Sequence, residues 1–176
     1  MKIICFGDSN TWGYDSRGYW GGRYNHPWPE ILAQKMDCWV INQGENGREI
    51  PIGAVDLSAD ADLLILMLGT NDLLQGASPE VVRDRMEQLL KSLNQESILL
   101  IAPPPMKFGA WVPNQSLIDN SKSLAKHYQI LAKHLSVRYV DSGQWNVPLA
   151  YDGVHLTEEG HRVFAEGLID YLNKGD

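Results

Sequence analysis

The chain is poor in cysteine, in positive charge and in long apolar stretches. Its cysteines, Cys5 and Cys38, each lie in an apolar, strand-like run. That placement favours buried free thiols in a reducing compartment over a disulfide. The net charge of −7 argues against a nucleic-acid partner, because phosphates require clustered Lys and Arg. The longest apolar runs, such as residues 63–68, are too short to span a membrane, so no membrane insertion is expected.

A secretory signal is also absent from the sequence pattern. One Lys and four apolar residues precede Gly7, and a signal peptide needs a longer apolar region. We therefore expect a cytoplasmic protein, unless a leader has been removed. The 176 residues, of which 44% are hydrophobic and 21% charged, suit one globular domain.

Short apolar runs alternate with helical patterns five times along the chain. Strands are predicted at residues 2–6, 38–41, 63–68, 97–102 and 137–140, and helices at residues 28–36, after Ser78, at about 114–135 and after Thr157. This alternation predicts an α/β fold, a three-layer α/β/α sandwich on a five-stranded parallel sheet. The likeliest strand order is the flavodoxin-like 2-1-3-4-5. Residues 11–27 are expected to form a long loop, and residues 50–59 are ambiguous, with one short helix as an interpretation.

Polar, glycine-containing segments follow the first three strands, and another precedes the last helix. In a parallel sheet such segments emerge at one edge, outside the carboxyl ends of the strands. Residues distant in the chain can therefore converge there, and the candidates are Ser9, Gly47, Asn71, Asp152 and His155.

Each of these residues can supply a function that acyl transfer requires. The Ser9 hydroxyl is a nucleophile once a base such as His155 takes its proton. Asp152, three residues before His155, can orient the imidazole because Gly153 permits a tight turn. An oxyanion needs donors, which the backbone N–H groups of Ser9 and Gly47 and the Asn71 amide would supply. Taken alone, each segment could equally be a turn, a cap or a loop that carries a surface His. Their joint occurrence is the specific signal for acyl transfer.

Together these segments resemble the SGNH hydrolases, also called the GDSL esterase/lipase superfamily. The family blocks read here as Gly7-Asp8-Ser9-Asn10, Asn42-Gln43-Gly44-Glu45-Asn46-Gly47, Gly69-Thr70-Asn71-Asp72 and Asp152-Gly153-Val154-His155. The usual fourth residue of the first block is Leu, so Asn10 is a departure. The family's oxyanion glycine lies five residues after the Asn of the second block, which selects Gly47 over Gly44. The resemblance covers nearly the whole chain and implies a single SGNH hydrolase domain over residues 1–176.

The resemblance is closest to small bacterial arylesterases and acyltransferases, with carbohydrate acetylesterases among the relatives. It implies a serine esterase that hydrolyses short-chain carboxylic esters, acetyl or aryl, through an acyl-enzyme on Ser9. The partner would be a small-molecule ester. No metal or organic cofactor is implied, and the His and Cys residues show no zinc-type spacing.

Substrate binding is assigned to one residue of the first block, Asp8, and to four tryptophans outside the blocks: Trp12, Trp20, Trp111 and Trp145. The tryptophans fall in segments after strands, where they could border the site; packing of the loops onto the domain is the alternative for each. Exposed aromatics could instead serve a homo-oligomer. For Arg48, a surface salt bridge is favoured over binding of an anionic group.

Other functions remain open at this point. A lysophospholipase or thioesterase-type acyl hydrolase uses the same chemistry. A non-catalytic carbohydrate-binding module could use the Trp-rich loops but would not need Ser9 with His155. A phosphate-sensing receiver needs a Lys after the fifth strand, where Ser142 and Gly143 stand instead. The natural ester, the balance between hydrolysis and transfer, and the oligomeric state do not follow from the sequence.

Overall fold

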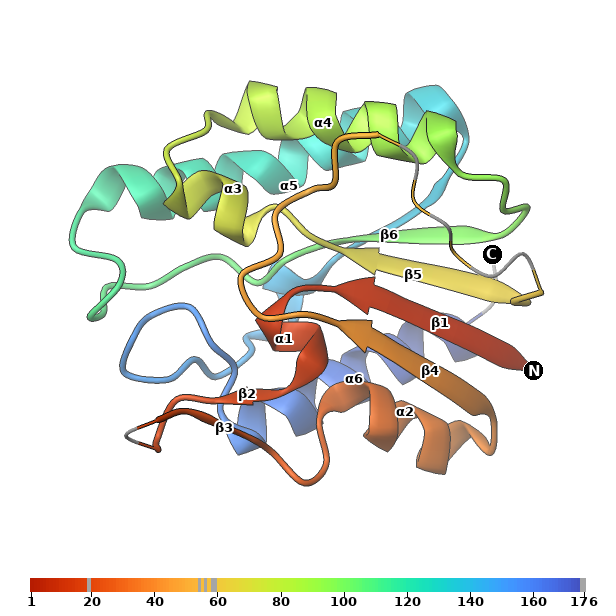
Figure 1. The fold of residues 1–176 in the computed structure, drawn as a ribbon, viewed down its shortest axis with the longest axis horizontal. Helices are drawn as coiled ribbons and strands as arrows, with labels where there is room; N and C mark the ends of the chain where they lie inside the picture. Colours follow the sequence, from red (N-terminus) through yellow and green to blue (C-terminus); the bar gives the residue numbers. More distant parts are fainter. Residues whose placement is uncertain (19, 54, 56, 58–59, 175–176) are drawn as a thin grey trace.

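A five-stranded parallel sheet forms the centre of the computed structural model, which describes residues 1–18, 20–53, 55, 57 and 60–174. The strands are β1 (Lys2–Gly7), β4 (Trp39–Gly44), β5 (Leu63–Met67), β6 (Ile98–Ala102) and β7 (Arg138–Asp141). They lie in the order β4-β1-β5-β6-β7 (Figure 1). This is the predicted flavodoxin-like order, so β1 and β5 are neighbours and their carboxyl ends lie side by side.

Helices cover both faces of the sheet (Figure 1). One face carries α3 (Thr70–Leu74), α4 (Pro79–Ser92) and α5 (Gln115–Leu135), and the other carries α2 (Trp28–Met36) and α6 (Glu158–Asn173). The three longest helices each begin at a capping side chain that accepts a backbone N–H: Ser78, Asn114 and Thr157. The predicted three-layer sandwich is therefore confirmed.

The two core layers follow from the alternation of side chains along the central strands. Ile4, Leu64 and Leu100 point to the face under α4 and α5, whereas Ile3 and Ile65 point to the face under α2 and α6. Each of these side chains is fully buried. Burial of one such side chain is worth about 1.5–3 kcal/mol, so the sheet is held from both sides. Strands that are apolar throughout are expected where both faces are covered.

The segment after β1 differs from the predicted long loop. It contains a short helix, α1 (Ser9–Trp12), and an antiparallel hairpin of β2 (Tyr14–Asp15) and β3 (Gly22–Arg23). β4 also runs further than predicted, because Asn42 pairs with Cys5 and Gly44 with Gly7 in the sheet. A short 3-10 helix, η1 (Ser142–Trp145), follows β7.

Two smaller expectations need correction. Residues 50–53 do not form a helix, and residues 54, 56, 58 and 59 of the ambiguous segment lie outside the described residues. Both cysteines are free thiols, as predicted, but only Cys5 is fully buried. Cys38 is half-buried because it precedes the first residue of β4, at the sheet edge. Within the described part of the chain, no helix is long and apolar enough to cross a membrane.

Candidate active site

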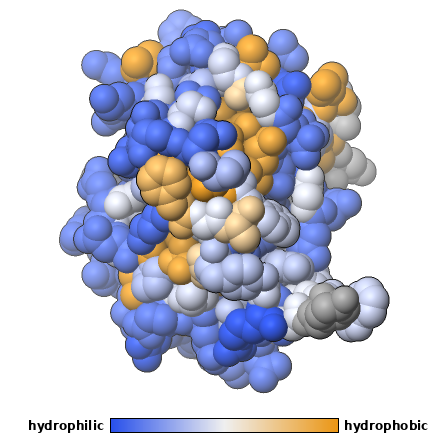
Figure 2. All heavy atoms as spheres, turned by 90° about the vertical axis from the view of Figure 1, so that its left-hand side faces the viewer, coloured by the Kyte–Doolittle hydropathy of each residue, from blue (hydrophilic) through white to orange (hydrophobic). Residues whose placement is uncertain are grey.

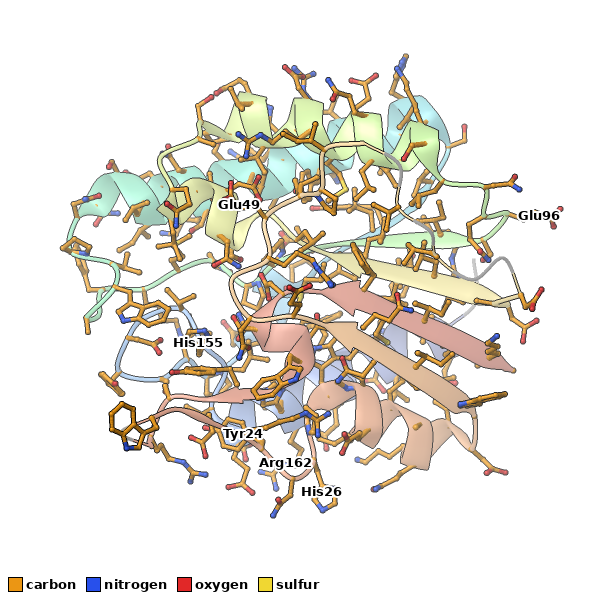
Figure 3. All side chains as sticks on the ribbon, viewed as in Figure 1. Tyr24, His26, Glu49, Glu96, His155 and Arg162 are labelled. Carbon is orange, nitrogen blue, oxygen red and sulfur yellow. The ribbon has the colours of Figure 1, made fainter. Side chains whose placement is uncertain are left out.

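The carboxyl ends of all five strands point to one edge of the sheet (Figure 1). His155 lies at this edge, whereas Glu96, in the turn before β6, lies at the opposite end of the molecule (Figure 3). The segments singled out in the sequence follow β1, β4 and β5 or precede α6. They therefore meet at this edge, where open α/β folds bind ligands.

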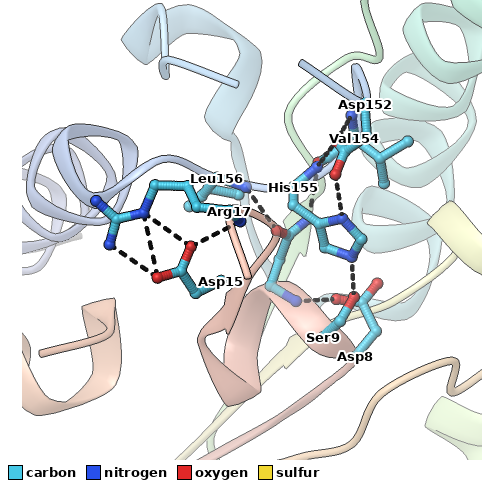
Figure 4. Close-up of polar contacts among 9 residues, drawn as sticks. Asp8, Ser9, Asp15, Arg17, Asp152, Val154, His155 and Leu156 are labelled. Carbon is cyan, nitrogen blue, oxygen red and sulfur yellow. Dashed lines mark hydrogen bonds and ion pairs between the residues drawn. The ribbon is translucent and has the colours of Figure 1, made fainter. Parts of the chain in front are cut away.

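Ser9 is presented by the turn from β1 into α1. Asp8 is the N-cap of α1, and its Oδ1 accepts the N–H of Asn10 at 2.9 Å. Ser9 is the first helical residue, and its Oγ lies 2.9 Å from Nε2 of His155, although 146 positions separate the two (Figure 4). Both residues are buried, Ser9 being 6% exposed and His155 3% exposed.

Asp152 holds the other side of the imidazole. Its Oδ2 lies 2.8 Å from Nδ1 of His155, and its Oδ1 accepts the backbone N–H groups of Val154 and His155 at 2.9 Å each (Figure 4). The turn between them depends on Gly153, whose φ is +82° and where a Cβ would overlap the carbonyl oxygen of Lys107. A side chain is excluded there on both counts, as the sequence predicted for a tight turn.

The charge state of Asp152 follows from these bonds. Burial favours the neutral acid, but hydrogen bonds from the His155 ring and from two backbone N–H groups outweigh it and lower the pKa below its ordinary value. An ionised carboxylate can only accept, so Nδ1 of His155 carries the ring proton. The lone pair of Nε2 then faces the Ser9 hydroxyl, which is the arrangement that a general base requires.

Two aromatic rings flank the imidazole of His155. The Tyr14 ring centroid, from β2, lies 4.5 Å away, and that of Trp111, from the loop after β6, lies 4.9 Å away in an edge-on contact. Tyr14 was not among the predicted site residues. Nothing in its local sequence signals this contact, because the β2–β3 hairpin that carries it was not predicted.

The three predicted oxyanion donors lie in neighbouring segments. The N–H of Ser9 has no partner within α1, as at any first helical position. Gly47 turns the chain after β4 with φ +75° and faces open space, whereas a Cβ at Gly44 would overlap the backbone of Trp12. Asn71 lies in α3, and its Nδ2 donates to the carbonyl oxygen of Arg48 at 3.0 Å.

A partly buried ion pair stabilises the segment after Gly47. Asp72 is fully buried; its Oδ1 lies 2.6 Å from Nη1 of Arg85 on α4, and its Oδ2 accepts the N–H of Ile50 at 3.0 Å. Arg85 also reaches Glu49, which is labelled in Figure 3, at 3.2 Å. The sequence identified Asp72 within a family block but gave no signal for Arg85, since that contact depends on how α4 packs.

Arg48 has a structural role, as favoured from the sequence. Its guanidinium pairs with Glu45 at 2.6 Å and donates to the carbonyl oxygen of Gly7 at 2.9 Å and to that of Gln43. It also lies over the Phe6 ring, 4.2 Å from its centroid. The side chain thus ties the end of β1 to the segment after β4.

Among the residues assigned to substrate binding, Trp111 lies against the imidazole of the triad. Trp20 is 92% exposed in the β2–β3 turn. The Arg23 guanidinium lies over the Trp12 ring, with its Cζ 5.8 Å from the ring centroid. Two further assigned residues have structural contacts, and their part in substrate binding stays a prediction. Trp145 packs edge-on against Phe164 of α6 with centroids 5.1 Å apart, so the core accounts for it. Asp8 is 1% exposed and caps α1, so its carboxylate faces the chain interior.

The surface around the site has apolar groups at its centre. Figure 2 looks onto this edge and shows exposed hydrophobic residues ringed by hydrophilic ones. Phe108 and Trp111, 64% and 49% exposed, lie in the loop after β6. A cavity of about 790 Å³ lies elsewhere; it is lined by Tyr24, His26, Arg162 and others, and none of the triad residues belongs to its wall (Figure 3). No group of three or more His, Cys, Asp or Glu among the described residues is placed to hold a metal.

Comparison with known proteins identifies the family of this chain. An arylesterase of Vibrio mimicus is 25% identical over 98% of this chain and 88% of its own length. A solved carbohydrate acetylesterase family member from Sinorhizobium meliloti is 27% identical with a TM-score of 0.81, covering 98% of this chain and 97% of its own. The native aryl esterase of M. smegmatis is 26% identical with a TM-score of 0.77, and 98% of each chain is covered. The pattern of the GDSL-like lipase/acylhydrolase family matches residues 5–163. The chain therefore belongs to the GDSL-like lipase/acylhydrolase family and is a hydrolase of the SGNH/GDSL type.

Proposed function

We propose that this protein is a serine esterase that hydrolyses small carboxylic esters with short acyl chains, acetyl or aryl esters, through an acyl-enzyme on Ser9. The observation that carries the proposal is the continuous line of short contacts from Ser9 Oγ to His155 Nε2 at 2.9 Å and from His155 Nδ1 to Asp152 Oδ2 at 2.8 Å. A hydroxyl, an imidazole and a carboxylate in this order form the arrangement that activates a serine.

The first half of the reaction forms the acyl-enzyme. Ser9 Oγ attacks the ester carbonyl carbon while His155 Nε2 takes the hydroxyl proton. Asp152 stabilises the imidazolium that results. The tetrahedral oxyanion receives hydrogen bonds from the N–H groups of Ser9 and Gly47 and from Asn71. His155 then gives its proton to the leaving alcohol oxygen as the C–O bond breaks.

The second half regenerates the free enzyme. Water attacks the acyl carbon while His155 takes one of its protons. The bond from the acyl carbon to Ser9 Oγ breaks, and the proton on His155 returns to Ser9. The same three residues thus act twice, and no metal or cofactor has a part in these steps.

The preference for short acyl chains is supported by the surroundings of the triad. Trp111 and Tyr14 stand within 5 Å of the imidazole, centroid to centroid. Bulky rings this close narrow the space for an acyl chain and offer flat surfaces to an aryl or sugar group. The names of the relatives, arylesterase and carbohydrate acetylesterase, point the same way.

The test is turnover of p-nitrophenyl esters from acetate to octanoate by wild type and Ser9→Ala. We expect turnover that peaks at acetate or butyrate and disappears in Ser9→Ala. A peak at octanoate would favour the lysophospholipase or thioesterase alternative. A Ser9→Ala variant as active as wild type would overturn the mechanism. Labelling of wild type, and not of Ser9→Ala, by a fluorophosphonate checks that the serine is activated.

A further inference from the structure

The residue after the nucleophile, Asn10, connects the two ends of the chain at the site. Its Nδ2 donates to the carbonyl oxygen of Val154 at 3.1 Å, and its Oδ1 accepts the N–H of Leu156 at 2.9 Å. Val154 and Leu156 are the neighbours of His155 on either side (Figure 4). Asn10 is 3% exposed, so these bonds are shielded from water.

We propose that Asn10 is a positioning residue, which holds the backbone on both sides of His155 so that the imidazole stays within reach of Ser9. This inference rests on the proposed function, in which His155 is the base. The side-chain amide of Asn10 acts here like a peptide group of a neighbouring strand, with one donor and one acceptor engaged. One hydrogen bond on each side of His155 restricts both the position of its backbone and its rotation about the chain axis.

The two hydrogen bonds of the Asn10 amide, to Val154 and to Leu156, form a clamp on the His155 segment. This clamp is anchored on the Ser9 side. Asn10 follows Ser9 directly, and its own backbone N–H is held by Oδ1 of Asp8 at 2.9 Å. On the other side, the N–H of Ala150 donates to the carbonyl oxygen of His155 at 2.8 Å, which closes the turn. The distance between nucleophile and base is thereby set by a path of hydrogen bonds that does not include the Ser9–His155 contact itself.

These two hydrogen bonds explain why the first block has Asn10 where the family usually has Leu. Leu, the usual residue at this place, has neither a donor nor an acceptor. Here the carbonyl of Val154 and the N–H of Leu156 belong to buried residues, and such groups need partners. This chain therefore uses a polar clamp where Leu would offer only packing.

The test is a double-mutant cycle on kcat with p-nitrophenyl acetate: wild type, Asn10→Asp, His155→Ala and the double variant. Asn10→Asp keeps the size and the acceptor but replaces the donor to Val154 with an oxygen. We expect kcat to fall about 10²-fold, the cost of a misplacement of about 1 Å, with KM changed less than about threefold. In the His155→Ala background the same change should cost less than about twofold, because the base that it positions is gone.

Asn42→Asp is the matched control. The Nδ2 of Asn42 also donates to a backbone carbonyl, that of Thr11 at 2.9 Å, but not on the His155 segment. The fall in kcat that Asn42→Asp causes, whatever its size, should be the same with and without His155. Asn10→Leu is the second variant, in case Asn10→Asp does not fold; thermal unfolding reports on the fold of each.

Four results decide the matter. An equal fall for Asn10→Asp in both backgrounds, or activity of both Asn10 variants within about threefold of wild type, would overturn the clamp. A fall confined to the background that contains His155 supports it. Wild-type activity of His155→Ala would instead overturn the proposed function, so the two failures are distinct.

Discussion

The carboxylate of Asp152 holds His155 at two different atoms. Its Oδ2 lies 2.8 Å from the ring Nδ1, and its Oδ1 accepts the backbone N–H of the same residue at 2.9 Å. Backbone and ring are thus oriented by one side chain. The orientation leaves Nε2 facing Ser9 and fixes which ring nitrogen carries the proton.

Asp152→Asn should lower kcat/KM by up to about 10⁴-fold. The backbone N–H groups of Val154 and His155 still require an oxygen at the Oδ1 position, so the new amide nitrogen faces Nδ1. Nδ1 of His155 must then accept the amide N–H. The ring proton therefore sits on Nε2 and points toward Ser9, which is the wrong tautomer for a base. The measurement is p-nitrophenyl acetate turnover at neutral pH.

The control for this prediction is Asp141→Asn. Oδ1 of Asp141 accepts the N–H of Gly143 at 2.9 Å and caps η1. Asn caps helices as well as Asp does, so its activity should stay within about threefold of wild type. If Asp141→Asn were the more damaging change, Asp152 would not be the orienting residue.

Asn71→Ala should lower kcat by about 10²–10³-fold with a small effect on KM. One N–H of the Asn71 amide is engaged by the Arg48 carbonyl at 3.0 Å, and in the proposed mechanism the second donates to the oxyanion. The comparison is Asn114→Ala, which removes an exposed helix cap and should cost stability alone. A loss of less than about threefold for Asn71→Ala would argue against an oxyanion donor.

Asp8→Asn should stabilise the protein above pH 6. Burial raises the pKa of Asp8 from 3.8 to about 6, and Oδ2 has no hydrogen-bond partner among the described residues. The folded state therefore favours the protonated acid, so this contribution is fully present below pH 3.8 and is lost as pH rises through about 6. The loss amounts to about 3 kcal/mol at neutral pH.

Urea unfolding of wild type and Asp8→Asn at pH 7.5 and pH 4.5 measures this effect. The variant keeps the cap on α1 and loses the buried charge, so its advantage should appear at the higher pH and shrink at the lower. An equal difference in unfolding free energy at the two pH values would show that ionisation of Asp8 is not the cause.

His161→Gln should make the protein less sensitive to acid. His161 is fully buried on α6; its Nδ1 accepts the N–H of Trp28 at 3.3 Å, and Nε2 has no hydrogen-bond partner among the described residues. Burial lowers its pKa from 6.5 to about 3. The neutral ring is favoured in the folded state, so its contribution is present above pH 6.5 and is lost as pH falls toward 3.

Between pH 7.5 and pH 5, wild type should lose about 2 kcal/mol of unfolding free energy relative to His161→Gln. Gln retains an acceptor for the Trp28 N–H and does not titrate. The same urea titrations serve for the measurement. Parallel losses in the two proteins would indicate that His161 does not account for the acid sensitivity.

Much of the architecture could be predicted because its causes are local. Residues 63–68 are apolar throughout, and such a run can only be buried on both faces. Caps such as Ser78 and Thr157 mark helix starts by chemistry confined to one turn. Once strands and helices alternate, chain handedness leaves few arrangements of the sheet.

The segment after β1 could not be predicted for the opposite reason. Strands β2 and β3 have two residues each, too few for any periodicity to register. Trp145 was expected at the site because it follows a strand, but the space beside Phe164 on α6 determines where its ring lies. Such packing depends on residues far away in the chain.

The sequence by itself determined the sheet order, the family and the residue types that meet at the carboxyl edge, because each rests on short motifs and on the rules of parallel sheets. Only the tertiary structure decided the distances: the 2.9 Å between Ser9 and His155, the ring of Tyr14 against the imidazole, and the bonds of Asn10 to both neighbours of His155. Side-chain contacts between residues 146 positions apart arise from packing of the whole chain, which no local pattern encodes.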